Sequence, residues 1–197
     1  MGMMLVSRIE TLFDRYGRRR NDHPDAEPVS PLAHALQCAQ LAEAAGAQTP
    51  MIAAALLHDI GHILHAPRSP DESDDVHELQ AMLLLAPMFG PEVVEPIRWH
   101  VQAKRYLVTT DTRYLGGLTR ASAQALAVQG GPMSRDERLA FETLPFAQQA
   151  LQLRRWDDLA KEPGKAVPPL ARYLSVLLGL AGRAEAPHLL SDALELV

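Results

Sequence analysis

The residues best suited to chemistry form one short run, His58-Asp59-Ile60-Gly61-His62, directly after an apolar stretch. An adjacent imidazole and carboxylate are costly to bury unless the carboxylate has a partner that offsets its lost hydration. A metal ion suits both groups. In a helix, positions 58, 59 and 62 fall within an arc of about 100°, so their side chains can share one cavity. The alternative is a helix with a polar edge that faces solvent.

Further histidines lie on other predicted helices, at His34, His77 and His100. Histidines and acids on separate helices are what a helical bundle needs to build a metal site in its core. Each histidine also has a simpler interpretation. His34 could be a satisfied core residue, His77 a polar residue of a first turn, and His100 a C-terminal residue facing the helix dipole.

The elements that must position these residues are helices. Apolar residues recur at helical spacing, without the sustained alternation of half-buried strands, so we predict an all-α fold. Ser30 followed by Pro31 is typical of a helix start, and Gly46 of its end. A nearly all-apolar helix over 50–64 is expected to be central and buried.

The rest of the chain follows the same pattern. We predict helices over 76–89, 92–103, 145–161 and 169–180, an irregular segment over 106–118, and a new helix start near Ser134 after two glycines and a proline. The whole chain, 1–197, is expected to be one domain with a core of about 27–181, to which an N-terminal helix and a C-terminal tail are added.

Composition limits the class of protein. A chain of 197 residues with 47% hydrophobic residues can bury a core without staples, and its one cysteine, Cys38, excludes an intramolecular disulfide. No uncharged run reaches the ~20 residues that a bilayer span needs, so we expect a cytoplasmic protein without a membrane partner. The net charge of -5 argues against nucleic-acid binding. A monomer or homodimer is expected.

The order His34, His58-Asp59 and a distal Asp resembles the H…HD…D pattern of the HD-domain superfamily of metal-dependent phosphohydrolases. The fold implied is a helical bundle, and the extra histidines resemble the binuclear members, which implies a binuclear site in its core. The resemblance assigns one ion to His34, His58, Asp59 and the distal acid, and the other to Asp59, His77 and His100. Asp59 is then the bridge.

The distal acid is Asp157 or Asp158, both in LQLRRWDDLAK. Asp157 is preferred because LRRWD matches the family's last motif in register. The alternative is that this acidic pair only forms surface ion pairs with Arg154 and Arg155.

Longer stretches, among them HALQCA, QGGPM and LRRWDDLAK, look like the phosphonate-degradation branch of HD proteins over about 27–161. These are mixed-valence di-iron oxygenases related to myo-inositol oxygenase. The resemblance implies two iron ions, Fe(II)/Fe(III), and dioxygen as co-substrate. The reaction implied is cleavage of the carbon–phosphorus bond of a small 1-hydroxyphosphonate, such as 2-amino-1-hydroxyethylphosphonate, to phosphate and a carboxylic acid.

The same resemblance supplies substrate contacts. Lys104, Ser122 and Arg154 resemble the residues that hold the phosphonate oxygens, which is chemically apt because a dianion needs cations and donors. Each could instead be an ordinary surface residue. Glu27 matches a glutamate that recognises a substrate amino group. The family's tyrosine that caps one iron is missing, because Pro24 stands near its place, and His23 is the alternative residue for that role.

Two residues are expected to act directly in catalysis, Asp59 as the bridging ligand and His62 as a histidine that also touches substrate. The alternative function is an HD-type phosphohydrolase, in which the same ligands activate water against a phosphate ester or nucleotide. A third is a degenerate HD domain that only binds a ligand. Iron content separates both enzymes from the inert module, and oxygen dependence separates the enzymes from each other.

Overall fold

The computed structural model describes residues 2–18, 27–64 and 81–181, and within these ranges it contains helices and no strand, which confirms the all-α prediction. The elements in chain order are α1 (Gly2–Leu12), the π-helical turn η1 (Phe13–Gly17), α2 (Pro31–Ala44), α3 (Thr49–Leu57), α4 (Ile60–Leu64), α6 (Pro91–Thr110), α7 (Tyr114–Gly117), α8 (Arg120–Val128), α9 (Arg135–Glu142), α10 (Ala147–Leu159) and α11 (Leu170–Ala181). Residues 81–85 are also helical.

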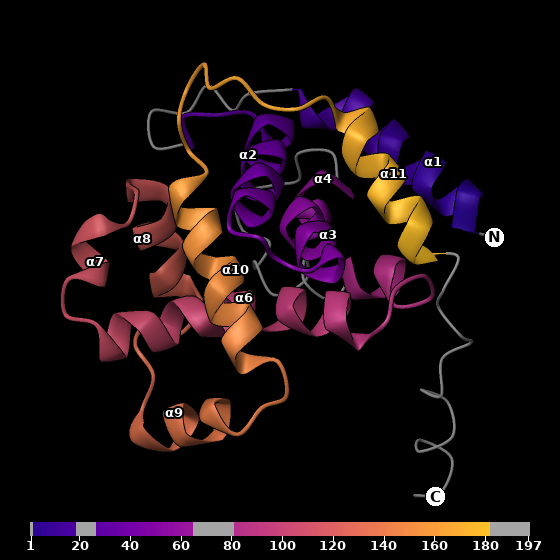
Figure 1. Ribbon diagram of the computed structural model, residues 1–197. Coiled ribbons are helices and arrows are strands. Elements are labelled where there is room, and N and C mark those ends of the chain that lie inside the picture. The colour runs from indigo at the N-terminus through magenta and orange to yellow at the C-terminus, as the bar shows by residue number, and fades with distance from the viewer. Residues whose placement is uncertain (1, 19–26, 65–80, 182–197) are drawn as a thin grey trace, which may run out of the picture.

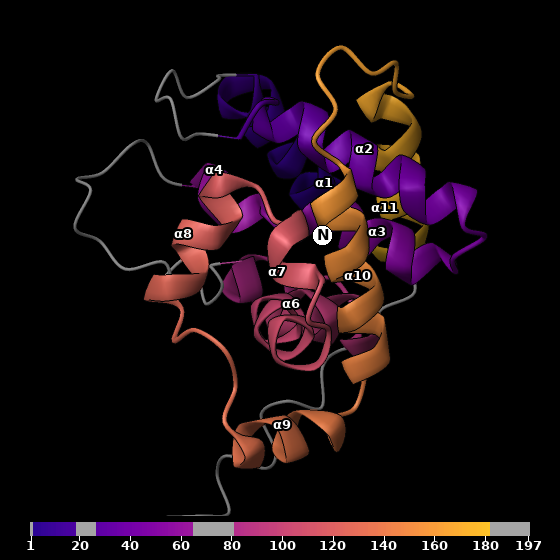
Figure 2. The same ribbon diagram turned by 90° about the vertical axis from the view of Figure 1, so that its left-hand side faces the viewer.

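Four helices form the centre of the bundle. α10 packs along α6 and also contacts α2 and α3, while α3 packs on both α2 and α6 (Figure 1). Figure 2 looks along α6 and shows α10 beside it. α1 and α11 pack together at one end of the molecule, and α7 and α8 lie at the other (Figure 1). The site residues on α2, α3, α6 and α10 are therefore brought to the middle.

The predicted boundaries of α2 are confirmed. The Ser30 hydroxyl accepts a hydrogen bond from the Ala33 N–H at 3.3 Å, and Pro31 follows as the first helical residue. After the helix, Gly46 has a φ of 68°, a left-handed conformation that costs glycine little. The predictions for 145–161 and 169–180 also agree with α10 and α11 to within two residues.

The prediction of one continuous helix over 50–64 is wrong. The chain forms α3 and α4, with His58 and Asp59 at the junction. The His58 imidazole donates to the Ala55 carbonyl at 2.9 Å, which is the oxygen that the Asp59 N–H would use in an uninterrupted helix. The His62 N–H bonds instead to the Asp59 carbonyl at 3.0 Å, three residues back. The break therefore lies within the His58-Asp59 motif itself.

The prediction that 106–118 is irregular is also wrong. α6 continues to Thr110, and Tyr114–Gly117 form the short helix α7. Burial of Leu107 extends the apolar face of α6, and the Thr109 hydroxyl donates to the Arg105 carbonyl one turn back. Tertiary packing thus outweighs the weak helix propensity of the threonines.

The predicted restart near Ser134 is confirmed by α9, which begins with a capping box. The Ser134 hydroxyl accepts from the Glu137 N–H at 3.3 Å, and the Glu137 carboxylate accepts from the Ser134 N–H at 2.8 Å. Glu137 also accepts from the Arg105 guanidinium at 2.7 Å. This carboxylate therefore ties α9 to α6.

Changing Glu137 to glutamine should lower the stability in a pH-dependent way. Hydrogen bonds from the Ser134 backbone, then from Arg105, lower the pKa of Glu137 to about 2. Because the folded pKa is below the unfolded one, the stabilisation is present at neutral pH and is lost as pH falls from about 4.5 towards 2. In thermal melts, Glu137→Gln should have a lower Tm than wild type at pH 7, and the difference in Tm should be smaller at pH 4.

Glu142→Gln, at the other end of α9, is the matched control, because the amide oxygen can still accept from the Tyr106 hydroxyl, which donates to Glu142 at 3.0 Å. A gap for Glu137→Gln that stays constant or widens between pH 7 and pH 4 would contradict the assigned role.

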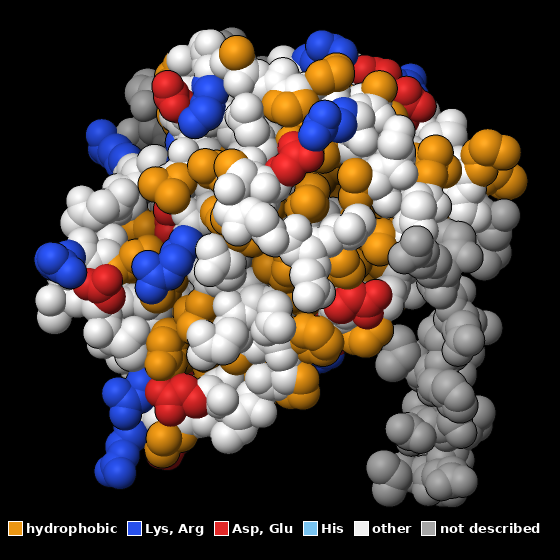
Figure 3. Space-filling view, viewed as in Figure 1, with side chains coloured by type: hydrophobic (Ala, Val, Ile, Leu, Met, Phe, Trp, Pro, Cys, Tyr) orange, Lys and Arg blue, Asp and Glu red, His pale blue; other side chains and the backbone are white. Residues whose placement is uncertain are grey.

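The surface offers no strong concentration of one charge on the face drawn in Figure 3, where basic and acidic side chains are scattered among neutral ones. Among the helices that the structure describes, none is long and apolar enough to cross a membrane.

Candidate metal centre

Three of the predicted histidines, on α2, on α6 and at the junction of α3 and α4, are oriented in the same way. The Nδ1–H groups of His34, His58 and His100 donate to the backbone carbonyls of Ala160 (2.9 Å), Ala55 (2.9 Å) and Ile97 (2.6 Å). A carbonyl oxygen can only accept, so Nδ1 must carry the proton in each ring. This leaves every Nε2 as the atom available to a metal, and a carbonyl bond of this kind is what fixes a metal-binding imidazole.

The Nε2 atoms converge in the core. His34 Nε2 and His58 Nε2 are 3.2 Å apart, and the His58 and His100 rings meet edge to face with centroids 5.4 Å apart. All three side chains are buried. Two lone pairs at this distance repel each other unless a proton or a metal ion lies between them.

Asp59 faces the histidines with both oxygens. Its Oδ2 lies 3.6 Å from the Nε2 atoms of both His34 and His58, and its Oδ1 lies 3.8 Å from His100 Nε2 and 3.9 Å from His62 Nε2. Each carboxylate oxygen therefore faces a different pair of imidazoles. A carboxylate in this position can bridge two ions.

Asp157 completes the cluster from α10. Its Oδ1 lies 3.3 Å from His34 Nε2 and 4.0 Å from His58 Nε2. Asp158, the other candidate, turns away and pairs with Arg154 and with the Tyr114 hydroxyl. Of the two acids, the structure brings Asp157 to the histidines.

The charge states fit a cation site. Burial raises the pKa of Asp59, but the His58 and His62 imidazoles outweigh it and hold this pKa below its ordinary value. Burial likewise raises the pKa of Asp157, but the Arg154 guanidinium and His34 keep it well below the ordinary value. Burial lowers the pKa of His100 to about 4, so its Nε2 lone pair is free at neutral pH.

The surroundings of His34 favour a positive charge at this position. Burial lowers the pKa of His34, yet its hydrogen bonds to Cys38 and Asp157 and the charge of the Asp157 carboxylate raise it well above the ordinary value. Without a metal, a proton therefore remains on Nε2, and a bound metal would displace that proton.

Cys38 also lies beside the cluster, with its Sγ 3.7 Å from His34 Nε2. The donor atoms of His34, Cys38 and His58 lie within 4.8 Å of one another. Burial raises the pKa of the Cys38 thiol, and a thiol, unlike a thiolate, is a poor metal ligand. We therefore interpret Cys38 as a neutral neighbour of the cluster.

The donor set fits a transition metal. Imidazole nitrogens with a few carboxylate oxygens suit iron or zinc, whereas magnesium prefers oxygen ligands and retained water. His77, the further predicted ligand, lies outside the described residues, so its assignment stays a prediction.

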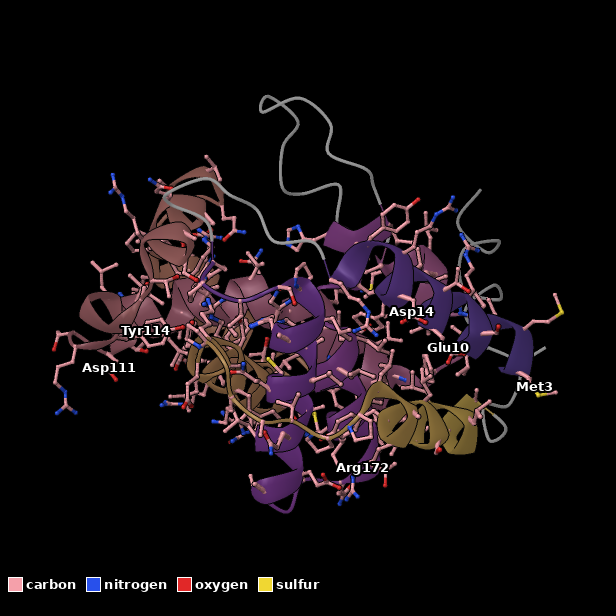
Figure 4. The ribbon with its side chains drawn as sticks, turned by 90° about the horizontal axis from the view of Figure 1, so that it is seen from above. Met3, Glu10, Asp14, Asp111, Tyr114 and Arg172 are labelled. Atoms are coloured by element: carbon pink, nitrogen blue, oxygen red, sulfur yellow. The ribbon has the colours of Figure 1, made fainter. Side chains whose placement is uncertain are left out.

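A group of polar side chains adjoins the metal cluster, made up of Arg154, Asp158, Tyr114 and Ser122. Arg154, buried on α10, pairs with Asp157 at 2.7 Å and with Asp158, and donates to the Tyr114 hydroxyl at 3.0 Å. Its Nη2 also lies 3.4 Å from the Ser122 hydroxyl. From above, Tyr114 is at the side of the molecule opposite α1 (Figure 4). Arg154 and Ser122, predicted as phosphonate contacts, are thus brought together.

Glu27 belongs to the same group of polar side chains. Its Oε1 accepts from the Thr119 hydroxyl at 2.9 Å, from Lys161 Nζ at 2.7 Å and from the Ser122 hydroxyl at 3.4 Å. Lys104 is buried on α6 one turn after His100. Their roles toward a substrate stay predictions, as does that of the half-exposed His62.

Sequence reasoning missed Lys161 and Tyr114. Lys161 follows Asp157 by four residues, a spacing that places two side chains on one helical face and would have pointed to it. Tyr114 had no such signal, since it lies in the segment expected to be irregular.

Comparison with known proteins places these residues in a family context. The model of the HD domain matches residues 32–176. The chain is 44% identical over 170 residues to hydroxymethylphosphonate dioxygenase of Gimesia maris, covering 84% of each chain. It is 36% identical over 167 residues to the glycine-betaine-forming [1-hydroxy-2-(trimethylamino)ethyl]phosphonate dioxygenase of Leisingera caerulea, covering 83% of this chain and 84% of that one.

A third relative, the uncharacterized protein L432 of Acanthamoeba polyphaga mimivirus, is 33% identical over 179 residues and has no stated activity. The family model covers most of the chain and includes the helices that carry His34, His58, His100 and Asp157. The chain therefore belongs to the HD-domain family.

Proposed function

We propose that this protein is a metal-dependent dioxygenase that cleaves the carbon–phosphorus bond of a small 1-hydroxyphosphonate. The observation that carries the proposal is the position of Asp59, whose two oxygens face different imidazoles, in a chain with two relatives named as hydroxyphosphonate dioxygenases. The overall reaction converts the substrate and dioxygen into phosphate, a carboxylate and a proton. One oxygen atom of dioxygen enters the phosphate and the other enters the carboxylate.

The ligands are assigned as the resemblance implies. His34, His58, Asp59 and Asp157 would hold one ion, and Asp59, His77 and His100 the other. When bound, an Fe(II)/Fe(III) pair would supply the redox chemistry that activates dioxygen.

The protein's own residues bind and orient the substrate. Lys104, Ser122 and Arg154 would receive the phosphonate oxygens beside the cluster, where little water competes for charge-assisted hydrogen bonds. Asp157 and Asp158 hold the Arg154 guanidinium in place before substrate arrives, so its geometry is preorganised. His62, half-exposed with its Nε2 3.9 Å from Asp59 Oδ1, would accept the proton of the substrate hydroxyl.

Phosphate release with and without dioxygen tests the proposal. Iron-loaded protein, prepared anaerobically, should release phosphate from hydroxymethylphosphonate or 2-amino-1-hydroxyethylphosphonate only when dioxygen is admitted. A generic phosphate monoester should stay intact. Oxygen-independent release from the ester, with both phosphonates untouched, would instead identify a phosphohydrolase.

A further inference from the structure

Gln37 is a buried polar residue of α2 that the proposed function does not use. Only 1% of it is exposed. Its amide nitrogen donates to the backbone carbonyl of Glu162 at 2.9 Å, and its amide oxygen accepts from the backbone N–H of the same residue at 3.0 Å. A primary amide offers a donor and an acceptor side by side. Gln37 therefore binds both backbone groups of one residue, 125 positions further along the chain.

The backbone that Gln37 holds follows the end of α10, which contacts α2 (Figure 1). Carbonyls at the C-terminal end of a helix have no partner within the helix, and the Ala160 carbonyl accepts from the Nδ1–H of His34 at 2.9 Å. His34 and Gln37 are three residues apart on α2, so they share one helical face. The two side chains therefore hold the same short segment, His34 at residue 160 and Gln37 at residue 162.

The Ala160 carbonyl fixes the orientation of the His34 ring. With Nδ1 bound to this carbonyl, Nε2 lies 3.3 Å from Asp157 Oδ1 and 3.6 Å from Asp59 Oδ2. The carbonyl can do this only while its own backbone stays in place, and the two bonds from Gln37 restrain that backbone two residues further on. Partners that orient a metal-binding histidine change metal affinity by about 10- to 100-fold.

We propose that Gln37 is a positioning residue of the metal centre, which acts through residues 160–162 and keeps the His34 imidazole directed at the bound ion. The inference rests on His34 as a metal ligand, which is part of the proposed function, and it does not depend on the substrate. The alternative is that Gln37 only joins α2 to the end of α10. Its bonds would then stabilise the metal-free fold without affecting metal affinity.

Metal affinity of Gln37→Met separates these two roles. The substitution keeps the approximate length of the side chain and removes both hydrogen bonds to Glu162. We expect the folded variant to bind Fe(II) and Zn(II) about tenfold or more weakly than wild type, as measured by anaerobic competition with a chelator. The measurement is made well below the Tm of the variant, so a loss of stability alone leaves the Kd unchanged. An unchanged Kd in folded Gln37→Met would overturn the proposal.

Gln40→Met is the matched control, because it makes the same substitution three residues later on the same helix. The Gln40 side-chain oxygen is buried without a hydrogen-bond partner among the described residues, so no bond to the end of α10 is lost from it. Its affinity for both metals should equal that of wild type. A loss of affinity as large as that of Gln37→Met would overturn the proposal, because it would be a general effect of altering α2.

Hydrogen exchange in the wild-type protein provides a test that does not depend on the folding of Gln37→Met. Coupling between two sites is reciprocal, so a contact that strengthens metal binding is strengthened by the metal to the same extent. Zn(II) should therefore slow exchange of the Glu162 amide by about tenfold or more, as measured by NMR with and without the ion. The Glu137 amide, which donates to the Ser134 hydroxyl in α9, should exchange at the same rate in both states.

A Glu162 amide whose exchange does not respond to Zn(II) would contradict the proposal. Failure of the proposed function is a different result. If wild type bound neither Fe(II) nor Zn(II), the assignment of His34 as a ligand would be wrong, and the inference would fall with it. If wild type bound both metals but released no phosphate from either phosphonate, only the proposed reaction would fail, and the comparison of Gln37→Met with Gln40→Met would still decide the role of Gln37.

Discussion

Protein with Asp59 changed to alanine is expected to retain almost no iron and to release phosphate at least about a thousandfold more slowly than wild type. The reason is geometric. Asp59 Oδ2 serves His34 and His58 while Oδ1 faces His100, so a single truncation removes an oxygen ligand from both proposed ion positions. Metal analysis of the purified protein and the oxygen-dependent phosphate assay measure the two effects.

Asp14→Ala is the control for the Asp59 change. Asp14 is an exposed carboxylate of η1 that pairs only with Arg18 among its charged neighbours in the described residues, and it lies on the side of the molecule opposite Tyr114 (Figure 4). Exposed pairs of this kind contribute little, so iron content and activity should match wild type. Full iron content in Asp59→Ala would refute the assignment of Asp59 as a bridge.

Arg154→Met should produce the second large effect, a loss of stability of about 3–5 kcal/mol together with loss of activity. Arg154 is 4% exposed and compensates two carboxylates, Asp157 and Asp158. Without the guanidinium, Asp158 loses its paired cation, and Asp157 keeps only Lys161 at 3.7 Å and His34 at 3.3 Å. Guanidinium chloride unfolding of metal-free protein at pH 7 gives the free energy of unfolding directly.

Two variants make the interpretation of Arg154→Met specific. Arg155→Met changes the exposed neighbour on α10 and should leave stability nearly unchanged. Adding Asp158→Asn to Arg154→Met removes one unbalanced charge and should restore part of the loss, because residues in one network are coupled. A double variant no more stable than Arg154→Met would argue against charge compensation as the cause.

Acidification should reduce the difference in the free energy of unfolding between Arg154→Met and wild type. In wild type the pKa of Asp157 lies below its unfolded value, so the stability from its ionised form is present at neutral pH and is lost as pH falls through the folded pKa. In the variant, Asp157 lacks the guanidinium and takes up a proton at higher pH, which relieves the penalty. The free energies of unfolding of wild type and Arg154→Met should therefore become more similar as pH falls from 7 to 4.

Much of the fold could be predicted from local signals. Ser30, Pro31 and Gly46 act through hydrogen bonds and backbone angles within a few residues of themselves, and α2 begins and ends where they indicated. One error arose where tertiary packing decides, since α6 runs past Ala103 to Thr110 because Leu107 is buried. The other lies at the HD motif, where α3 stops at Leu57 and His58 and Asp59 face residues of other helices.

The sequence alone determined which donor types this protein offers, since His34, His58, Asp59, His100 and Asp157 are distinguished by residue type, apolar flanks and family motif. The tertiary structure decided which atoms of those residues meet. Only packing of α10 against α2 and α6 brings the Ala160 carbonyl to His34, directs Asp157 rather than Asp158 at the histidines, and places Lys161 on Glu27. These contacts join residues more than a hundred positions apart, and side-chain direction over such separations depends on how helices pack rather than on periodicity within one helix.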